Sequence, residues 1–326
     1  MLIQAKQQKV HYLFCFGKHE TAEDFAKAKR IADVFRPHLY APEGSNVARK
    51  NLEEYREINH RIEKARKNPD ERREWLASVD EMTKGHPFRE YFMAQASYVI
   101  DSRDKIYQYS LDVHSSPFDN EAEKMHRTRN ESLQLASLGD MPGAKSRMIE
   151  AARSNAESTS RRETDIVEGM KTFVPDVLVI LSQLEKYNPL KVFSTWGTLH
   201  ANIYARASEM FRDDPNVILE MRELETTPLL PFSRITFSFM VGKQVSDELV
   251  LQAIVARILF KKYELEGGRA GNSSKEHVLQ LSCKLGYDQI QELLVRNALK
   301  QQQTDLDDWY VRVGSEFEAL AGMINN

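Results

Sequence analysis

The hydrophobic pattern near the start of the chain predicts a buried strand. The run HYLFCFG, at residues 11–17, is aromatic or aliphatic almost without interruption. Such a run is typical of a strand that is covered on both faces, as in a parallel sheet. Gly17 ends the run, and the chain then becomes polar. The sequence therefore predicts one strand of a parallel sheet at this position.

The pattern then changes to the period of a helix. Apolar residues recur every three or four positions from Phe25 to Phe35. Thr21 and Asp24 are spaced like a capping pair at a helix start. Pro37 cannot continue a helix and restricts the residue before it. We therefore expect a helix that begins just after Thr21 and ends before Pro37.

A second short apolar run follows at residues 38–41 and ends at Pro42 and Glu43. A strand, a helix and a second strand in this order form a unit whose strands are parallel. Open parallel sheets bind ligands beyond the carboxyl ends of their strands. This unit places His19 at one such end and Glu43 at the next.

A later segment, KVFSTWGTLH, repeats the arrangement. Residues 192–196 are strand-like, a glycine follows, and His200 precedes another helical run. If the two strands are neighbours in the sheet, His19, His200 and Glu43 converge on one edge. The spacing thus predicts a cluster of two imidazoles and a carboxylate.

The remaining segments differ in charge and period. Residues 46–160 are highly charged and helix-forming, and residues 161–189 are helical with a kink near Pro175. The segments NVILEMREL and SRITFSFMVG, at 216–224 and 233–242, are strand candidates because they are rich in β-branched and aromatic residues.

We therefore expect an α/β fold with a mostly parallel sheet flanked by helices. Its core is expected to comprise residues 1–45 and 161–245, with 46–160 as a helical insertion or cap that shapes substrate access. Residues 246–326 are expected to form a helical region packed on the core. The apolar spacing of that region is that of packing or of contacts in a homo-oligomer.

Composition narrows the classes of partner. The chain has 326 residues and a formal net charge of -3, so no bulk positive field favours non-specific nucleic-acid binding. Its apolar stretches are broken before the ~20 residues that a spanning helix needs, and the start of the chain shows no signal peptide. Cys15 and Cys283 have no partner at metal-ligand spacing, which indicates a reducing cytoplasm. No glycine-rich phosphate loop predicts a nucleotide.

Four short motifs resemble those of the superfamily that contains erythromycin esterase, haem-binding lipoproteins (ChaN-like) and Tiki/TraB proteins. The matching stretches are FGKHE at residues 16–20, APEG with Glu43, RRETD at 161–165, and WGTLH, which contains Gly197 and His200. Their order and spacing agree with the superfamily over residues 10–45 and 161–240. The first motif is one residue shorter between glycine and histidine than in Tiki-like members. It also lacks the acidic residue that esterase-like members place before the histidine, a role for which Glu20 is the candidate.

The resemblance implies hydrolysis of a peptide, amide or ester bond in a small molecule or peptide. Two imidazoles and a carboxylate suit a divalent metal such as Mn, Co or Zn, which would be held by His19, Glu43 and His200 and would activate water. Without a metal, a histidine oriented by a carboxylate, Glu43 or Glu20, would act as general base. Arg162 would then stabilise an oxyanion. The sequence does not separate these two mechanisms.

Plain structural interpretations compete with the catalytic one. His19 and Glu43 could each begin a helix beside the sheet, and Arg162 with Glu163 could be an exposed ion pair of small energetic value. A second class of function is also open: a catalytically degenerate member that binds a protein partner through its helical surface. The shortened first motif and the large charged insertion motivate this alternative.

Overall fold

The computed structural model divides into two compact units. It describes residues 8–17, 21–43, 51–86, 88–111, 118–224, 229–267, 272–301 and 305–324. The sheet unit comprises residues 1–115 and 161–227, and the helical unit comprises residues 116–160 and 228–326. The expected insertion is therefore divided, because residues up to 115 belong to the sheet unit and the rest to the helical unit. Residues 228–245, expected in the core, also belong to the helical unit.

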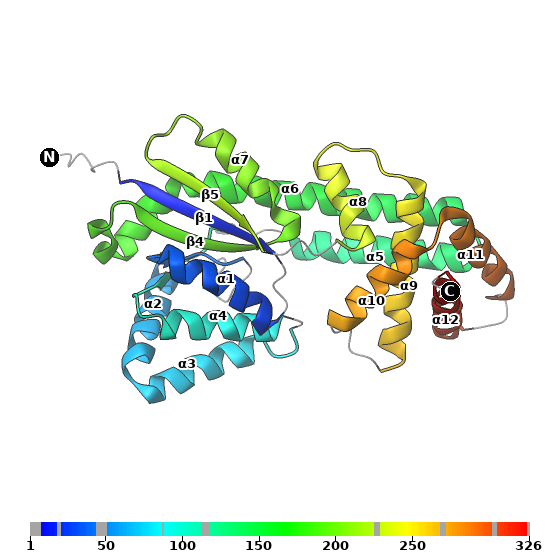
Figure 1. Ribbon diagram of the computed structural model, residues 1–326, viewed down its shortest axis with the longest axis horizontal. Helices are drawn as coiled ribbons and strands as arrows, with labels where there is room; N and C mark the ends of the chain where they lie inside the picture. Colours follow the sequence, from blue (N-terminus) through cyan, green and yellow to red (C-terminus); the bar gives the residue numbers. More distant parts are fainter. Residues whose placement is uncertain are drawn as a thin grey trace. The chain divides into compact units, whose positions relative to one another are not determined.

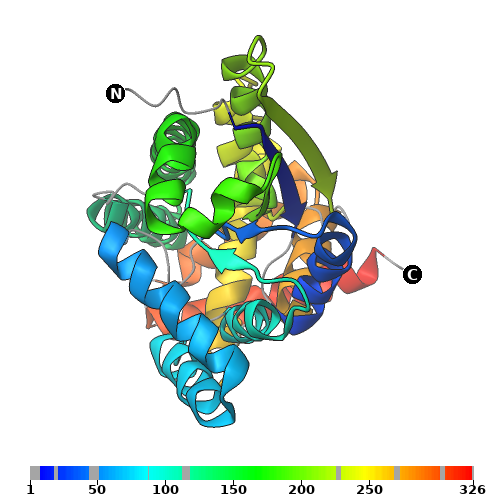
Figure 2. The same cartoon turned by 90° about the vertical axis from the view of Figure 1, so that its left-hand side faces the viewer.

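The sheet is entirely parallel and has five strands in the order β3-β2-β4-β1-β5. The strands are β1 (Val10–Gly17), β2 (Leu39–Tyr40), β3 (Tyr107–Gln108), β4 (Leu190–Gly197) and β5 (Val217–Glu223). The helices of this unit are α1 (Ala22–Phe35), α2 (Leu52–Lys67), α3 (Pro69–Met82), α4 (Arg89–Asp101), α7 (Asn202–Met210) and the part of α6 (Met141–Ile180) beyond residue 160. The predicted α/β fold with a parallel sheet flanked by helices is thus confirmed (Figures 1 and 2).

β1 lies between β4 and β5 and is covered on both faces, as its hydrophobic run predicted. Successive side chains of a strand point to opposite faces. The ring of Tyr12 lies 5.9 Å from that of Phe173 in α6, whereas the ring of His11 lies 5.0 Å from that of Phe35 in α1. Helices α1 and α6 therefore cover opposite faces of the same strand.

Helix α1 begins and ends as predicted. The Thr21 hydroxyl accepts a hydrogen bond from the backbone N–H of Asp24, and the Asp24 carboxylate accepts one from the backbone N–H of Thr21. Arg36 follows the helix with a φ of 56°, a left-handed cap, and Pro37 prevents continuation. This exit brings the chain directly into β2.

The strand predicted at residues 233–242 is wrong, because this segment belongs to α8 (Pro231–Met240). Its apolar side chains fit both periods. Read with a period of two, Ile235, Phe237 and Phe239 share one face and alternate with polar residues. Read as a helix, Phe232, Ile235 and Phe239 share one face. Those three pack into the core of the helical unit, so the helical period is the one that buries apolar surface.

Strand β3 was not predicted, because it lies within residues 46–160, which were expected to be helical. Only Tyr107 and Gln108 pair with β2. Two residues are too few to show an alternating pattern. β3 is instead fixed from outside, because the Asn59 side chain of α2 exchanges hydrogen bonds with the backbone N–H and C=O of Gln108.

The helical unit has its own core. It contains α5 (Phe118–Ser137), α8, α9 (Asp247–Leu265), α10 (Asn272–Lys284), α11 (Tyr287–Gln301), α12 (Leu306–Met323) and the part of α6 before residue 161. Helix α9 contacts α5, α8, α10, α11 and α12 and is buried along most of its length. A helix that is apolar nearly all round is expected at such a central position. The apolar spacing predicted as packing is accounted for within this unit.

Replacing Gly17 with alanine is expected to destabilise the sheet unit by about 1–3 kcal/mol. A Cβ at this position would lie 2.7 Å from the Cβ of Leu224, the residue after β5, so backbone would have to move. Hydrogen exchange of the β1 and β5 amides measures the effect. Gly322→Ala is the control, because an added Cβ there meets nothing within 4 Å. An unchanged exchange rate in Gly17→Ala would show that this close approach is not required.

Candidate functional site

Glu43 lies at the carboxyl end of β2, beside the end of β4. The chain continues along β4 after β2 ends, because the backbone N–H of Ala41 donates to Phe193 O and that of Glu43 donates to Thr195 O (2.9 Å). The Glu43 carboxylate then accepts a hydrogen bond from the backbone N–H of Gly197 through Oε2 (2.7 Å). Backbone pairing thus fixes both the position and the direction of this carboxylate.

His200 and Arg162 meet the other oxygen of Glu43. His200 ends a short 3₁₀ turn, η2 (Thr198–His200), that directly follows β4, and its Nε2 lies 2.9 Å from Glu43 Oε1. Arg162 Nη1, from α6, lies 3.1 Å from the same oxygen and 3.5 Å from His200 Nε2. The structure therefore brings together three predicted site residues that are 38 to 157 positions apart in the sequence.

Glu163 lies on the opposite side of the His200 ring. Its side chain is fully buried, with Oε1 at 3.7 Å from His200 Nδ1 and Oε2 at 3.5 Å from Arg206 Nε. Among the described residues, neither carboxylate oxygen has a hydrogen-bond partner. Consecutive helical residues point about 100° apart. Arg162 and Glu163 therefore do not form the pair with each other that the sequence suggested, and they act on different atoms of His200.

The two carboxylates keep His200 charged. Burial alone lowers its pKa, but Glu43 and then Glu163 outweigh burial and the repulsion from Arg162, so the pKa of His200 rises to about 9. At neutral pH the ring is therefore an imidazolium, flanked by Glu43 at Nε2 and Glu163 at Nδ1. A charged imidazole can donate a proton but cannot accept one.

Other polar side chains near the cluster were not predicted. The Tyr40 hydroxyl lies 2.9 Å from Thr195 Oγ1, two residues before the end of β4. Burial raises the pKa of Tyr91, and the negative charge of Glu43 raises it further. Tyr91 therefore stays neutral beside the carboxylate. Arg206, on α7, is the other missed residue. No spacing in the sequence links any of these residues to His200, so only the fold could identify them.

Two predicted site residues, His19 and Glu20, lie outside the described residues. Within the described ranges, no three His, Cys, Asp or Glu side chains are grouped so as to hold a metal ion. Glu43 and His200 are adjacent and would supply two donors of the predicted metal set. The third, His19, belongs to the part of the chain for which the structure gives no position.

Three comparisons with known proteins were negative. No family model, no curated protein and no solved structure matches it. In the part of the chain that the structure describes, no helix is long and apolar enough to span a membrane.

Proposed function

We propose that the protein is a hydrolase that cleaves a peptide, amide or ester bond at the carboxyl edge of its sheet. The observation that supports this most is that Arg162 and His200 both contact the same carboxylate oxygen, Oε1 of Glu43. They meet beyond the ends of β2 and β4, which is where open parallel sheets bind ligands. The proposal includes membership of the erythromycin esterase and Tiki/TraB superfamily and a cytoplasmic location, where the two free cysteines stay reduced.

The protonation state gives each residue a role. Arg162 would stabilise the negative charge that develops on the substrate carbonyl oxygen. Glu43 would take a proton from the attacking water, and His200 would give its proton to the leaving oxygen or nitrogen as the scissile bond breaks. Glu163 would hold Nδ1 and orient the ring. In this mechanism His200 is the general acid and Glu43 is the general base, whereas the sequence analysis had assigned the role of base to a histidine.

The donor chemistry also fits a divalent metal. Histidines that bind metals through one nitrogen usually donate the other N–H to a carboxylate or carbonyl, and Glu163 lies on the Nδ1 side of His200. Glu43 and His200, with His19, would hold the ion. A bound divalent metal would lower the pKa of a coordinated water. Arg162 would still bind the anionic part of the substrate.

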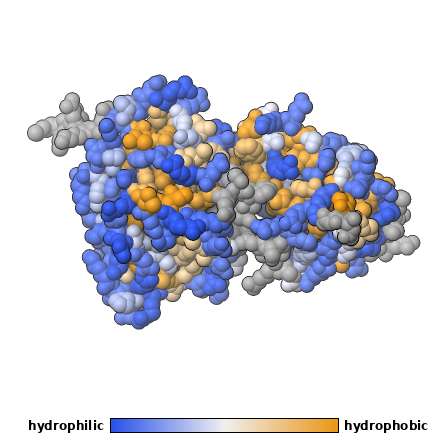
Figure 3. All heavy atoms as spheres, viewed as in Figure 1, coloured by the Kyte–Doolittle hydropathy of each residue, from blue (hydrophilic) through white to orange (hydrophobic). Residues whose placement is uncertain are grey.

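A protein-interaction module is the alternative, and one observation favours it. Glu43, Arg162 and His200 pair with one another, and their side chains are only 12%, 20% and 10% exposed. Such a cluster could serve stability alone. The surface would then carry the function: Val34 on α1 and Met82 on α3 are 85% and 57% exposed, and Figure 3 shows hydrophobic patches among hydrophilic side chains on the visible face of the sheet unit.

Substitution of His200 with alanine is expected to lower kcat/KM by about 100-fold or more, because proton transfer in the transition state is lost. The measurement is hydrolysis of a panel of peptides and esters, combined with metal analysis of the purified parent, His19→Ala and His200→Ala proteins. His60→Ala is the control, since His60 is exposed on α2. Metal in the parent that is absent from both site variants would support the metal mechanism. Equal, negligible metal and no hydrolysis in all of them would support the interaction module.

A further inference from the structure

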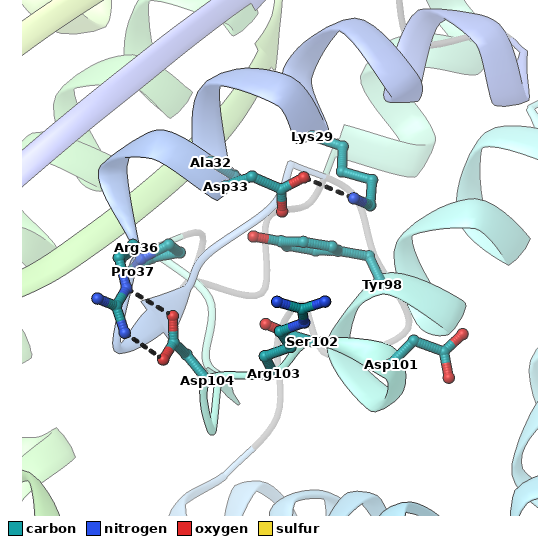
Figure 4. A pocket seen from close by; sticks show the side chains of 10 residues that line it. All are labelled: Lys29, Ala32, Asp33, Arg36, Pro37, Tyr98, Asp101, Ser102, Arg103 and Asp104. Atoms are coloured by element: carbon teal, nitrogen blue, oxygen red, sulfur yellow. Dashed lines mark hydrogen bonds and ion pairs between the residues drawn. The ribbon is translucent and has the colours of Figure 1, made fainter.

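A cavity lies at the end of the sheet opposite to the Glu43 and His200 cluster. It has a volume of about 610 Å³ and is lined by the second half of α1, the end of α4 and the loop that leads to β3 (Figure 4). Arg36 and Pro37 lie just before His38 and β2, and Asp104 precedes β3. The cavity is therefore at the amino ends of these strands, whereas Glu43 and His200 lie at the carboxyl ends. Its volume is in the range of small-molecule sites, about 300–1,000 Å³.

Ion pairs neutralise most charges of the cavity. Lys29 Nζ lies 2.6 Å from Asp33 Oδ2, and the Arg36 guanidinium donates two hydrogen bonds, of 2.8 and 2.9 Å, to the Asp104 carboxylate. Asp101 accepts a hydrogen bond of 2.9 Å from Arg72, which lies outside the lining. All three carboxylates of the lining are thus paired with cations.

Arg103 is the charged residue of the lining that is not paired. Its side chain is exposed, and among the described residues it has no ion pair or hydrogen bond. Figure 4 shows its guanidinium extending from the loop after α4 into the space below the ring of Tyr98. The cavity therefore presents one uncompensated positive charge.

Tyr98 supplies an unused hydrogen-bond donor. The residue as a whole is only 4% exposed, and its ring lines the cavity. Its hydroxyl has no hydrogen-bond partner among the described residues, and the oxygen is not enclosed. Burial, together with the Asp33 and Asp104 carboxylates, raises the pKa of this hydroxyl, so it remains a donor. The hydroxyl is open to the cavity, so an acceptor group of a ligand there can replace water as its partner.

We propose that this cavity binds an organic monoanion, a carboxylate carried on an apolar body of about the size of one ring. Arg103 and the Tyr98 hydroxyl would donate to the carboxylate. The Tyr98 ring, Ala32 and Pro37 would contact the apolar body. A phosphate dianion fits less well, because a single unpaired guanidinium faces it and three carboxylates line the same cavity.

Benzoate tests the proposal, with benzamide as its uncharged counterpart and inorganic phosphate as the competing anion. We expect benzoate to bind the full chain with a dissociation constant of about 1 mM, as a ligand of this size allows, in a calorimetric or saturation-transfer titration. Arg103→Gln should weaken binding about tenfold or more, since it removes a charged hydrogen bond. Tyr98→Phe should weaken it about threefold to tenfold and leave the thermal midpoint unchanged, because the hydroxyl has no internal partner to lose.

Arg212→Gln is the matched control, because it removes an exposed arginine of the same unit that does not line the cavity. Its affinity for benzoate should equal that of the parent. Absence of benzoate binding, equal binding of benzamide, binding of phosphate alone, or an unchanged affinity in Arg103→Gln would each overturn the proposal. The hydrolase proposal is independent of all these outcomes, since the two sites share no residue.

Discussion

Replacement of Glu43 by glutamine is expected to lower the free energy of unfolding of the sheet unit by about 3–5 kcal/mol. The carboxylate accepts from the Gly197 backbone and faces two cations, Arg162 and His200, all at 3.1 Å or less. Glutamine can still accept one hydrogen bond, but it cannot neutralise either cation in this largely buried position. The substitution should also abolish hydrolysis if Glu43 takes a proton from water.

Native-state hydrogen exchange of the β1 and β4 amides measures this loss, because it reports on one unit of a chain that has two. Glu220→Gln is the control. Glu220 pairs with His11 at 2.9 Å, but its side chain is 38% exposed, so the change should stay within about 1 kcal/mol. Equal, small effects in both variants would mean that the Glu43 cluster contributes no more than an exposed pair.

The first part of the fold was predictable because its determinants are local. The apolar run of β1, the capping pair Thr21 and Asp24, and the stop at Pro37 each act within a few residues of one another. Because one helix connects β1 to β2 over a short stretch of the chain, the two strands are expected to be parallel. β5 was found for the same reason, since its run of β-branched and aliphatic residues begins immediately at Val217.

Errors occurred where tertiary contacts decide. Residues 233–242 satisfy both the strand and the helix period, and burial in the helical unit selects the helix. β3 is too short to have a pattern and depends on Asn59 of another element. The division of residues 46–160 between two units likewise depends on which core each helix packs against, which charge and periodicity do not specify.

The part of the candidate site that lies at the ends of strands was predictable from the sheet topology. Glu43 and His200 each follow a strand, and neighbouring parallel strands bring such residues to one edge. Arg206, Tyr91 and the role of Glu163 could not be found, because they depend on the rotation of helices about their axes. The sequence predicted Glu43, the carboxylate at Nε2 of His200, but not Glu163, the carboxylate at Nδ1.

The pH dependence of stability tests the whole cluster, because it responds to both carboxylates. A group whose pKa is higher in the folded than in the unfolded state stabilises below the unfolded value and loses this effect as pH rises through the folded value. For His200 the change from 6.5 to about 9 corresponds to about 3 kcal/mol. We therefore expect the sheet unit to lose about 3 kcal/mol between about pH 6 and about pH 9.5.

The comparison is made between the parent and His200→Gln with a chelator present, so that other titrating groups cancel and no metal competes for the imidazole. The difference in stability between the two proteins should shrink as pH rises across this window. The window ends below pH 10, because burial raises the pKa of Tyr12 and Tyr91 in this unit. Their contribution to the stability of the folded state therefore decreases above pH 10, the ordinary pKa of tyrosine. A difference that stays constant with pH would mean that His200 is neutral when folded. It would then be the general base of the original hypothesis.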